Sequence, residues 1–201
     1  MGRPAGVKGA DTLRAVRKAA ITRIYDHGFE AMNLRDLAAD VGLRIGSLYN
    51  HVPQKQEFLY SLLESIMLEL LQDFGARMQG LKDPAERLLA FVRFHIEWHT
   101  ARREETFIGN MELRSLTPAQ YAGIVAHRKT YEKHLRSILN DGVKAGLWTL
   151  DDTRVTTLAL LSMLTGIGSW YREDGRLKQE KLIRIHQRLA QRMVGAPATV
   201  R

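Results

Sequence analysis

Apolar residues recur at three- and four-residue spacing along most of the chain, the period of a helix with one buried face. No stretch alternates between apolar and polar residues in the way of a half-buried strand. The helices that the pattern predicts span residues 12–27, 34–41, 45–52, 56–78, 85–100, 104–114, 118–145, 151–170 and 178–193. The chain is therefore predicted to be all-α, without internal repeats or low-complexity segments.

The two shortest predicted helices follow each other across a sharp turn. Asn33 is a good N-cap for the first helix, and Gly42 ends it because glycine adopts a positive φ without a Cβ clash. The apolar positions that face the partner helix are Leu34, Leu37, Ala38 and Val41 in the first helix and Leu48 and Val52 in the second. This arrangement is a helix-turn-helix, in which the second helix enters the major groove of DNA.

The outer face of the second helix carries small, polar and aromatic residues instead of the Glu and Lys of an ordinary solvent face. Such side chains can read base edges and hold phosphates. The residues expected to contact phosphates are Asn33, Tyr49, His51 and Lys55. The residues expected to face bases are Arg44, Ile45, Gly46 and Asn50, with Arg35 reaching in from the preceding helix and Ser47 completing the surface.

At these positions the chain resembles the TetR family of bacterial one-component repressors. The residues that carry the resemblance are Ala19–Ala20, Gly28–Phe29, Leu37–Ala38, Val41–Gly42, Gly46–Val52 and Lys55. The sequence departs from the family pattern at Asn33, where threonine is common, and at Pro53, which removes one backbone donor. The resemblance implies a three-helix DNA-binding head over residues 1–52, and a helical ligand-binding and dimerisation body over residues 53–201.

Composition is compatible with a DNA-binding protein. The 201 residues are 45% hydrophobic and 26% charged, and the net charge of +8 favours a polyanionic partner. There is no cysteine for a disulfide or a thiolate metal site. The most apolar window, residues 158–167, is too short to span a bilayer, so we expect a cytoplasmic protein without a membrane partner. Residues 1–10, rich in glycine with Arg3 and Lys8, are expected to form a flexible basic arm or a solubilising tail.

Catalytic chemistry has little support in the sequence. His95 and His99 share one helical face at the spacing of metal ligands, and Glu112 is a possible third group, but a metalloprotease pattern is absent. The segment from Gly166 to Trp170 matches neither a nucleophile elbow nor a dinucleotide loop. We therefore expect no enzyme, no cofactor and no metal site; a metal-dependent hydrolase is a weaker alternative.

The last two long helices carry more apolar and small residues than one core face needs. Two such helices from each of two subunits would bury these faces in a four-helix bundle, as in the TetR family. The residues expected at the interface are Leu158, Leu161, Thr165, Gly168, Leu182, His186, Leu189 and Met193. A homodimer fits a palindromic operator, because both have two-fold symmetry.

The body also offers aromatic and arginine side chains for a small-molecule effector. The turn over residues 170–177 resembles that of TetR-type regulators of fatty-acid and sterol breakdown that respond to acyl-CoA thioesters. The expected effector-binding residues are Phe94, Trp98, Phe107 and Met111 around an acyl chain, and Trp170, Arg172 and Arg176 at adenine and phosphates. Alternatively, Trp170 belongs to the dimer core and the arginines are solvated. The effector is then an uncharged hydrophobic compound, as for an efflux repressor, or the protein is an architectural DNA-binding protein without a ligand.

Overall fold

The structure is a computed structural model that describes residues 5–195, and within this range the chain is helical without strands. The helices are α1 (Ala5–His27), α2 (Leu34–Asp40), α3 (Ile45–Leu48), α4 (Lys55–Met78), α5 (Pro84–Ala101), α6 (Arg103–Met111), the 3-10 helix η1 (Glu112–Ser115), α7 (Pro118–Lys144), α8 (Thr153–Thr165), α9 (Ile167–Trp170) and α10 (Gln179–Met193). The predicted all-α class is confirmed, and no described helix is long and apolar enough to cross a membrane.

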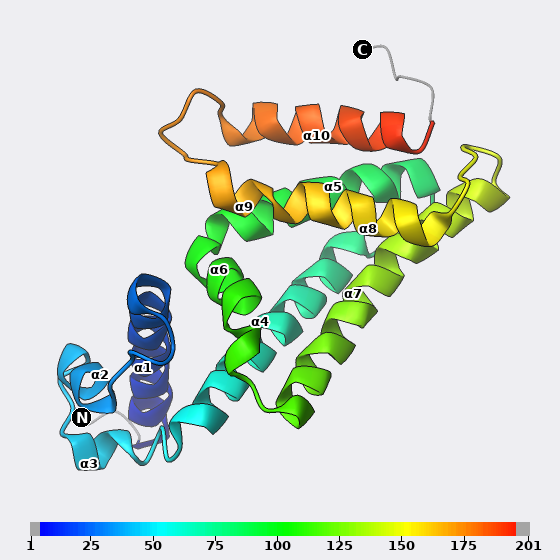
Figure 1. Cartoon of the computed structure of the whole chain (residues 1–201). Helices are drawn as coiled ribbons and strands as arrows, with labels where there is room; N and C mark the ends of the chain where they lie inside the picture. Colours follow the sequence, from blue (N-terminus) through cyan, green and yellow to red (C-terminus); the bar gives the residue numbers. More distant parts are fainter. Residues whose placement is uncertain (1–4, 196–201) are drawn as a thin grey trace. The chain divides into compact units, whose positions relative to one another are not determined.

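The helices pack as two compact units (Figure 1). Unit 1 takes the described residues up to Ile66 together with Glu104–Ile124. Unit 2 takes Met67–Arg103 together with the described residues from Val125 onward. The long helices α4 and α7 therefore each contribute one end to each unit. The division expected after residue 52 concerns function, and it stays a prediction.

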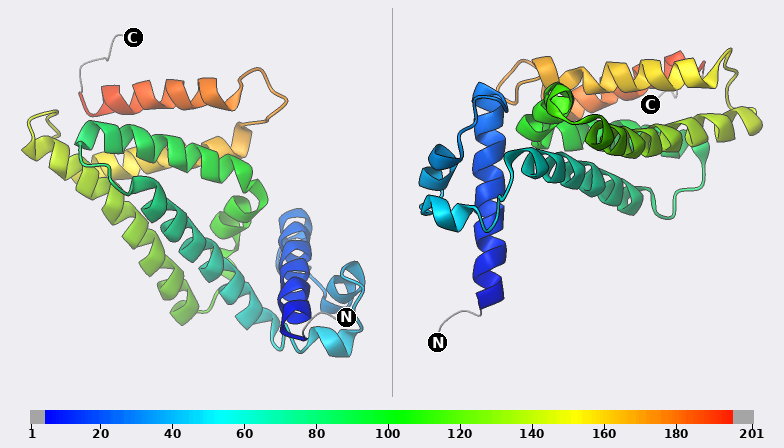
Figure 2. Two further views of the ribbon diagram at one scale, coloured as in Figure 1. Left: turned by 180° about the vertical axis from the view of Figure 1, so that it is seen from behind. Right: turned by 60° about the horizontal axis from the view of Figure 1, so that its bottom comes forward.

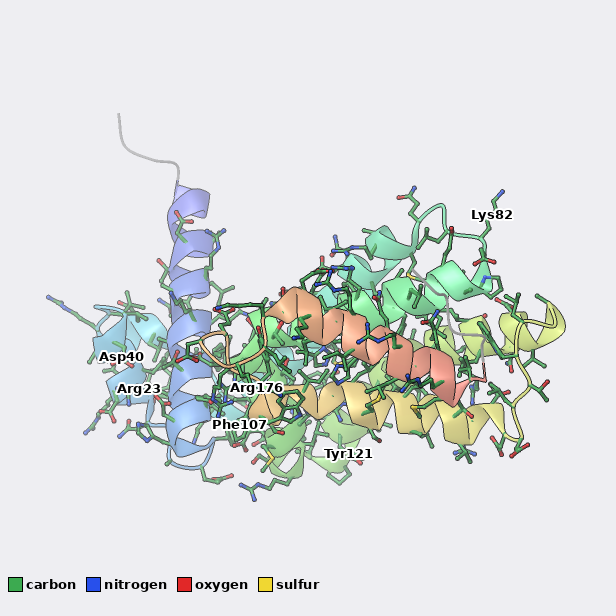
Figure 3. The ribbon with its side chains drawn as sticks, turned by 90° about the horizontal axis from the view of Figure 1, so that it is seen from above. Arg23, Asp40, Lys82, Phe107, Tyr121 and Arg176 are labelled. Atoms are coloured by element: carbon green, nitrogen blue, oxygen red, sulfur yellow. The ribbon has the colours of Figure 1, made fainter. Side chains whose placement is uncertain are left out.

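Helices α1, α2 and α3 form the N-terminal head within unit 1 (Figure 1). Their fully or nearly fully buried core includes Val16, Ala20, Ile24, Phe29, Leu37, Leu48 and Val52. At the surface, the Arg23 guanidinium makes two hydrogen bonds to Asp40 and so ties α1 to α2; both residues are labelled in Figure 3. These hydrogen bonds lower the pKa of the Asp40 carboxyl below its usual value. Arg23 also lies 3.7 Å from the Asp36 carboxylate, so it pairs with two acidic residues of α2 at the edge of the apolar core.

Helix α1 is longer than the hydrophobic pattern predicts, because it begins at Ala5 and not at Thr12. The expected arm over residues 1–10 is therefore wrong for residues 5–10, while residues 1–4 lie outside the described part of the chain. Each helical glycine, Gly6 and Gly9, costs about 1 kcal/mol relative to alanine. That cost does not stop a helix that continues directly from the buried stripe beginning at Val16.

In unit 2, α5 packs against α8, α9 and α10, which lie along it (Figures 1 and 2). The apolar core here includes Phe91, Val92, Ile96, Leu164 and Ile183, each at most 1% exposed. A buried face of this width explains why α5 is apolar on more than one side. It is the central helix of this unit.

The single helix predicted over residues 151–170 is wrong, because the chain divides it at Gly166 into α8 and α9. Glycine is a poor helix former, and the Ser169 hydroxyl donates to the Gly166 carbonyl at 2.7 Å, which competes with the regular helical pattern. Asp152 caps the start of α8, because its carboxylate accepts from the backbone N–H groups of Arg154 and Val155.

Candidate functional site

The turn between α2 and α3 has the local chemistry of a helix-turn-helix. Asn33 Oδ1 accepts the Arg35 backbone N–H at 2.8 Å and so caps α2. Gly42 has a φ of 67°, and the Leu43 N–H donates to the Ala38 carbonyl at 2.8 Å, which closes the end of α2. Arg44 then stands as the extended N-cap of α3. The predicted N-cap and glycine turn are confirmed.

Helix α3 separates its buried and exposed residues as the sequence predicts. Leu48 and Val52 are completely buried against the head core. The exposed residues are Arg44, Ile45, Gly46, Ser47, Tyr49 and Asn50, and His51 is half-buried. Asn33 and Arg35 are also exposed, at the start of the adjacent helix α2. The structure thus presents the expected DNA-contacting residues to solvent, while their roles at phosphates and bases stay predictions.

Lys55 has a structural contact that the sequence pattern does not reveal. Its ammonium group donates to the Glu30 backbone carbonyl at 3.0 Å and lies 4.5 Å from the centroid of the Phe29 ring. The side chain therefore joins the start of α4 to the corner between α1 and α2, where a cation over an aromatic face is stabilising. An ammonium has three donors, so Lys55 can make its expected phosphate contact in addition to this one.

Glu112, which is 4% exposed, also contacts this corner. The Phe29 backbone N–H donates to Glu112 Oε1 at 3.2 Å, and the Ser115 hydroxyl donates to Oε2 at 2.9 Å. Nearby in unit 1, the Tyr25 and Phe107 rings meet edge to face with centroids 5.0 Å apart. Helix α6 and η1 are thus attached directly to the N-terminal head.

A chain of amide contacts joins α4, η1 and α7 within unit 1. The Gln56 amide donates to the Ser115 carbonyl at 2.6 Å and to Gln120 Oε1 at 3.1 Å. The Gln120 amide in turn donates to Glu57 at 3.0 Å. Spacing alone does not bring these residues together, because they belong to three helices far apart in sequence. They make the beginning of α4 sensitive to the position of η1 and α7.

The stacked pair His95 and His99 is buried in unit 2. The ring centroids are 3.8 Å apart and the planes differ by 6°. His99 Nδ1 donates to the His95 carbonyl at 2.8 Å, and the Tyr131 and Thr165 hydroxyls lie 3.3 Å from the two nitrogens of His95. Burial lowers the pKa of His99 to about 4 and that of His95 well below its usual value, so both rings are neutral at pH 7.

The packing of this pair gives it a structural role. Glu112, considered as a third metal-ligating group, is engaged with Phe29 and Ser115 instead. Within residues 5–195, no three His, Cys, Asp or Glu side chains are grouped so that they could hold a metal ion.

The turn between α9 and α10 exposes the expected effector-binding residues. Trp170 is 52% exposed, with its ring centroid 6.4 Å from that of His186, and Arg172 and Arg176 are exposed as well. A pocket of about 290 Å³ lies beside the turn, and its lining consists of Thr100, Arg103, Gly168, Tyr171, Arg172, Glu173 and Asp174. Arg172 is thus the one expected residue that lines this pocket.

The expected acyl-chain residues fall into both units. Phe94 and Trp98 are buried in unit 2, beside an open groove of about 590 Å³ that also includes Asp73, Ala76, Arg77 and Glu97. Phe107 and Met111 belong to unit 1, where they are 44% and 46% exposed. Their participation in one acyl-binding site stays a prediction.

The expected dimer helices leave an apolar face uncovered in the single chain. Leu158, Leu189 and Met193 are between 37% and 44% exposed. Leu161, Thr165 and Gly168 are partly exposed, whereas Leu182 and His186 are buried within the chain's own packing. The two sets share one helical spacing, so the sequence pattern could not separate them.

Comparison with known proteins supports the interpretation of the chain as a helix-turn-helix regulator. Residues 81–194, more than half of the chain, match the family model "Tetracyclin repressor-like, C-terminal domain". The chain is 24% identical over 165 residues to the HTH-type transcriptional repressor KstR2 of Mycolicibacterium smegmatis, covering 81% of this chain and 80% of the relative.

Solved structures agree over nearly the whole chain. A TetR-family regulator from Rhodococcus RHA1 has a TM-score of 0.86 and 26% identity, covering 92% of this chain and 98% of that one. AibR in complex with isovaleryl coenzyme A and operator DNA has a TM-score of 0.82 and 27% identity, covering 92% of this chain and all of that one. The matched family and these relatives are transcriptional regulators and not enzymes, in agreement with the helix-turn-helix geometry. The chain belongs to the TetR family of transcriptional repressors.

Proposed function

We propose that this repressor binds a palindromic operator as a homodimer and is released from it by an acyl-CoA thioester. The operator part rests on the exposed surface of α3, where polar and aromatic side chains replace an ordinary solvent face. The dimer part rests on the uncovered apolar residues of α8 and α10, because an exposed apolar face of this kind favours association. The two-fold axis would place one α3 in each operator half-site.

The observation that carries the effector proposal is the exposed turn after α9. It places Trp170, Arg172 and Arg176 in one short segment, and an adenine can stack on an indole while guanidinium groups form paired hydrogen bonds with phosphates. AibR, whose structure contains isovaleryl coenzyme A, is similar over its entire length to 92% of this chain. That relative supports a coenzyme A thioester as the class of ligand, and the acyl group itself is left open.

The pocket beside the turn has mixed charge, which suits a ligand with more than phosphates. Arg103 and Arg172 supply cations, while Glu173 and Asp174 supply acceptors. The pantetheine arm of coenzyme A carries amide N–H and hydroxyl groups that such carboxylates can accept. The pantetheine arm can therefore use acceptors that the phosphates of the same ligand cannot.

Release from the operator requires that the effector bind the two states of the repressor unequally. The drop in operator affinity equals the ratio of the effector's affinities for the free and the DNA-bound forms. In unit 1, a movement of η1 or α7 would displace the start of α4 through the hydrogen bonds of Gln56. A movement of η1 would also displace the head through the hydrogen bond between Glu112 and Phe29. These contacts are the route by which we expect the ligand to reposition α3.

Titrating acyl-CoA thioesters of increasing chain length into the operator-bound protein tests this proposal. We expect release by at least one thioester, and weaker release by the double variant Arg172→Ala with Arg176→Ala. Lys82→Ala is the matched control, because Lys82 is an exposed cation at the other end of unit 2 from Arg176 (Figure 3). No release at any chain length, or equal release by the double variant, would favour an uncharged hydrophobic effector.

A further inference from the structure

Gly46 is the second residue of α3, and nothing in the protein's own structure requires a glycine there. Its φ is not positive, and a Cβ added to it would meet no other atom within 4 Å. A helical glycine costs about 1 kcal/mol relative to alanine. A glycine in such a position keeps bare backbone on the outer face of the helix, so a partner surface can approach it closely.

Ile45, directly before Gly46, is an apolar side chain on the same exposed surface. It is 36% exposed, although α3 buries Leu48 completely and so has its own core contact. Isoleucine offers no hydrogen bond to a base edge. In the major groove, the C5-methyl group of thymine is the apolar feature of a base pair, and a side chain such as this one can pack on it.

We propose that Ile45 packs against the C5-methyl group of a thymine in each operator half-site, and that Gly46 allows the α3 backbone to come close enough for this contact. The inference rests on the proposed function of α3 as the helix that enters the major groove. It assigns a specificity-determining role to one apolar side chain, whereas the polar residues around it hold phosphates or read hydrogen-bonding edges. A consequence is that the operator contains an obligatory thymine at one symmetric pair of positions.

Replacing single thymines by deoxyuridine tests the contact, because this change removes only the methyl group. The probe is a duplex selected by the full-length protein from a randomised library, with each thymine replaced in turn. We expect one symmetric pair of replacements to weaken binding about three- to tenfold, as for the loss of a buried methyl contact. With Ile45→Ala, which removes the contact from both half-sites at once, binding to the unmodified duplex should fall by at least the product of the two single-replacement factors. The same replacements should then have no further effect.

The role of Gly46 is tested with a pair of matched glycine variants. Gly46→Ala should leave the melting temperature unchanged or raised, while operator affinity falls at least about tenfold from the clash with DNA. Gly75→Ala is the control, since Gly75 in α4 is also helical, exposed and without an atom within 4 Å of an added Cβ. It should have the same effect on stability and none on DNA binding.

The outcomes distinguish this inference from the proposed function beneath it. If Arg44→Ala weakens binding but no deoxyuridine replacement depends on Ile45, the methyl contact is refuted while operator binding by α3 stands. If neither Arg44→Ala nor Tyr49→Ala changes binding, α3 does not enter the groove and the proposed function itself fails. Unchanged affinity of Gly46→Ala would refute the close approach of the backbone.

Discussion

Replacing Glu112 by alanine should loosen the DNA-binding head from η1. The carboxylate is 4% exposed, and it accepts the Phe29 backbone N–H at 3.2 Å and the Ser115 hydroxyl at 2.9 Å. Alanine leaves the Phe29 N–H without its acceptor at a buried position. Because Phe29 fills the head core at the corner after α1, this single contact links the head's backbone to the segment that joins α6 and α7.

The expected cost follows from the chemistry of that contact. A hydrogen bond to a charged group contributes about 1.5–3 kcal/mol, and a buried donor left unpaired costs about 1–3 kcal/mol. Removing the carboxylate also relieves some of the cost of its burial, so we expect the free energy of unfolding to fall by about 2 kcal/mol. For a chain of this size that corresponds to a decrease of about 4–8 °C in melting temperature.

Thermal melting followed by circular dichroism, with hydrogen exchange of the Phe29 amide, measures the effect. Glu112→Gln keeps an oxygen acceptor and should lose less than half as much. Glu104→Ala is the surface control, since Glu104 also bonds to α1, through the Thr22 hydroxyl, but at an exposed position. If Glu112→Ala melts like Glu104→Ala and the Phe29 amide exchanges no faster, the carboxylate does not hold the corner.

Three further predictions follow from burial and charge. Leu158→Glu should dissociate the dimer in sedimentation at low micromolar concentration, whereas Leu68→Glu, at an equally exposed leucine of α4, should not; a dimeric Leu158 variant would place the interface elsewhere. Burial lowers the pKa of His95 and His99, so the unfolded chain takes up protons first as pH falls through 6.5. In urea unfolding, the free energy of unfolding should therefore fall by about 1.5 kcal/mol per histidine between pH 6.5 and pH 5. With His99→Phe, the decrease should be smaller by the contribution of one histidine. Equal urea midpoints at both pH values would contradict this. Arg44→Ala should weaken operator binding but leave the slope of log affinity against log salt nearly unchanged, because Arg44 is expected to face a base; a slope reduced by about one would place its guanidinium at a phosphate instead.

Much of the DNA-binding surface could be predicted from the sequence, because it depends on neighbours within a few residues. The cap at Asn33, the positive φ of Gly42 and the inward direction of Leu48 are all set by local backbone chemistry and helical period. The outer face of α3 follows directly once the inner face is known. For the same reason the helix bounds agree closely where a cap or a glycine marks them. The end of α3 has no such mark, and the helix stops at Leu48 and not at residue 52 as predicted.

Where one pattern permits two structures, tertiary packing decided between them. Leu158 and Leu182 belong to similar apolar stripes, yet one is exposed and the other is buried against its own chain. An apolar stripe wide enough to pack against two neighbours does not reveal which of its residues the chain's own helices bury and which stay exposed.

The contacts of Glu112, Lys55 and the His95–His99 pair were also beyond the sequence. Glu112 and Lys55 contact segments that whole helices separate from them, and the stacked pair within α5 contacts Tyr131 of α7 and Thr165 of α8. A carboxylate, an ammonium or an imidazole can serve a metal, a phosphate or a buried hydrogen bond equally well. The sequence by itself determined the helices and the turn that presents α3. Only the folded chain decided which polar groups hold the head in place, because burial removes their water and leaves the nearest donor or acceptor as the partner.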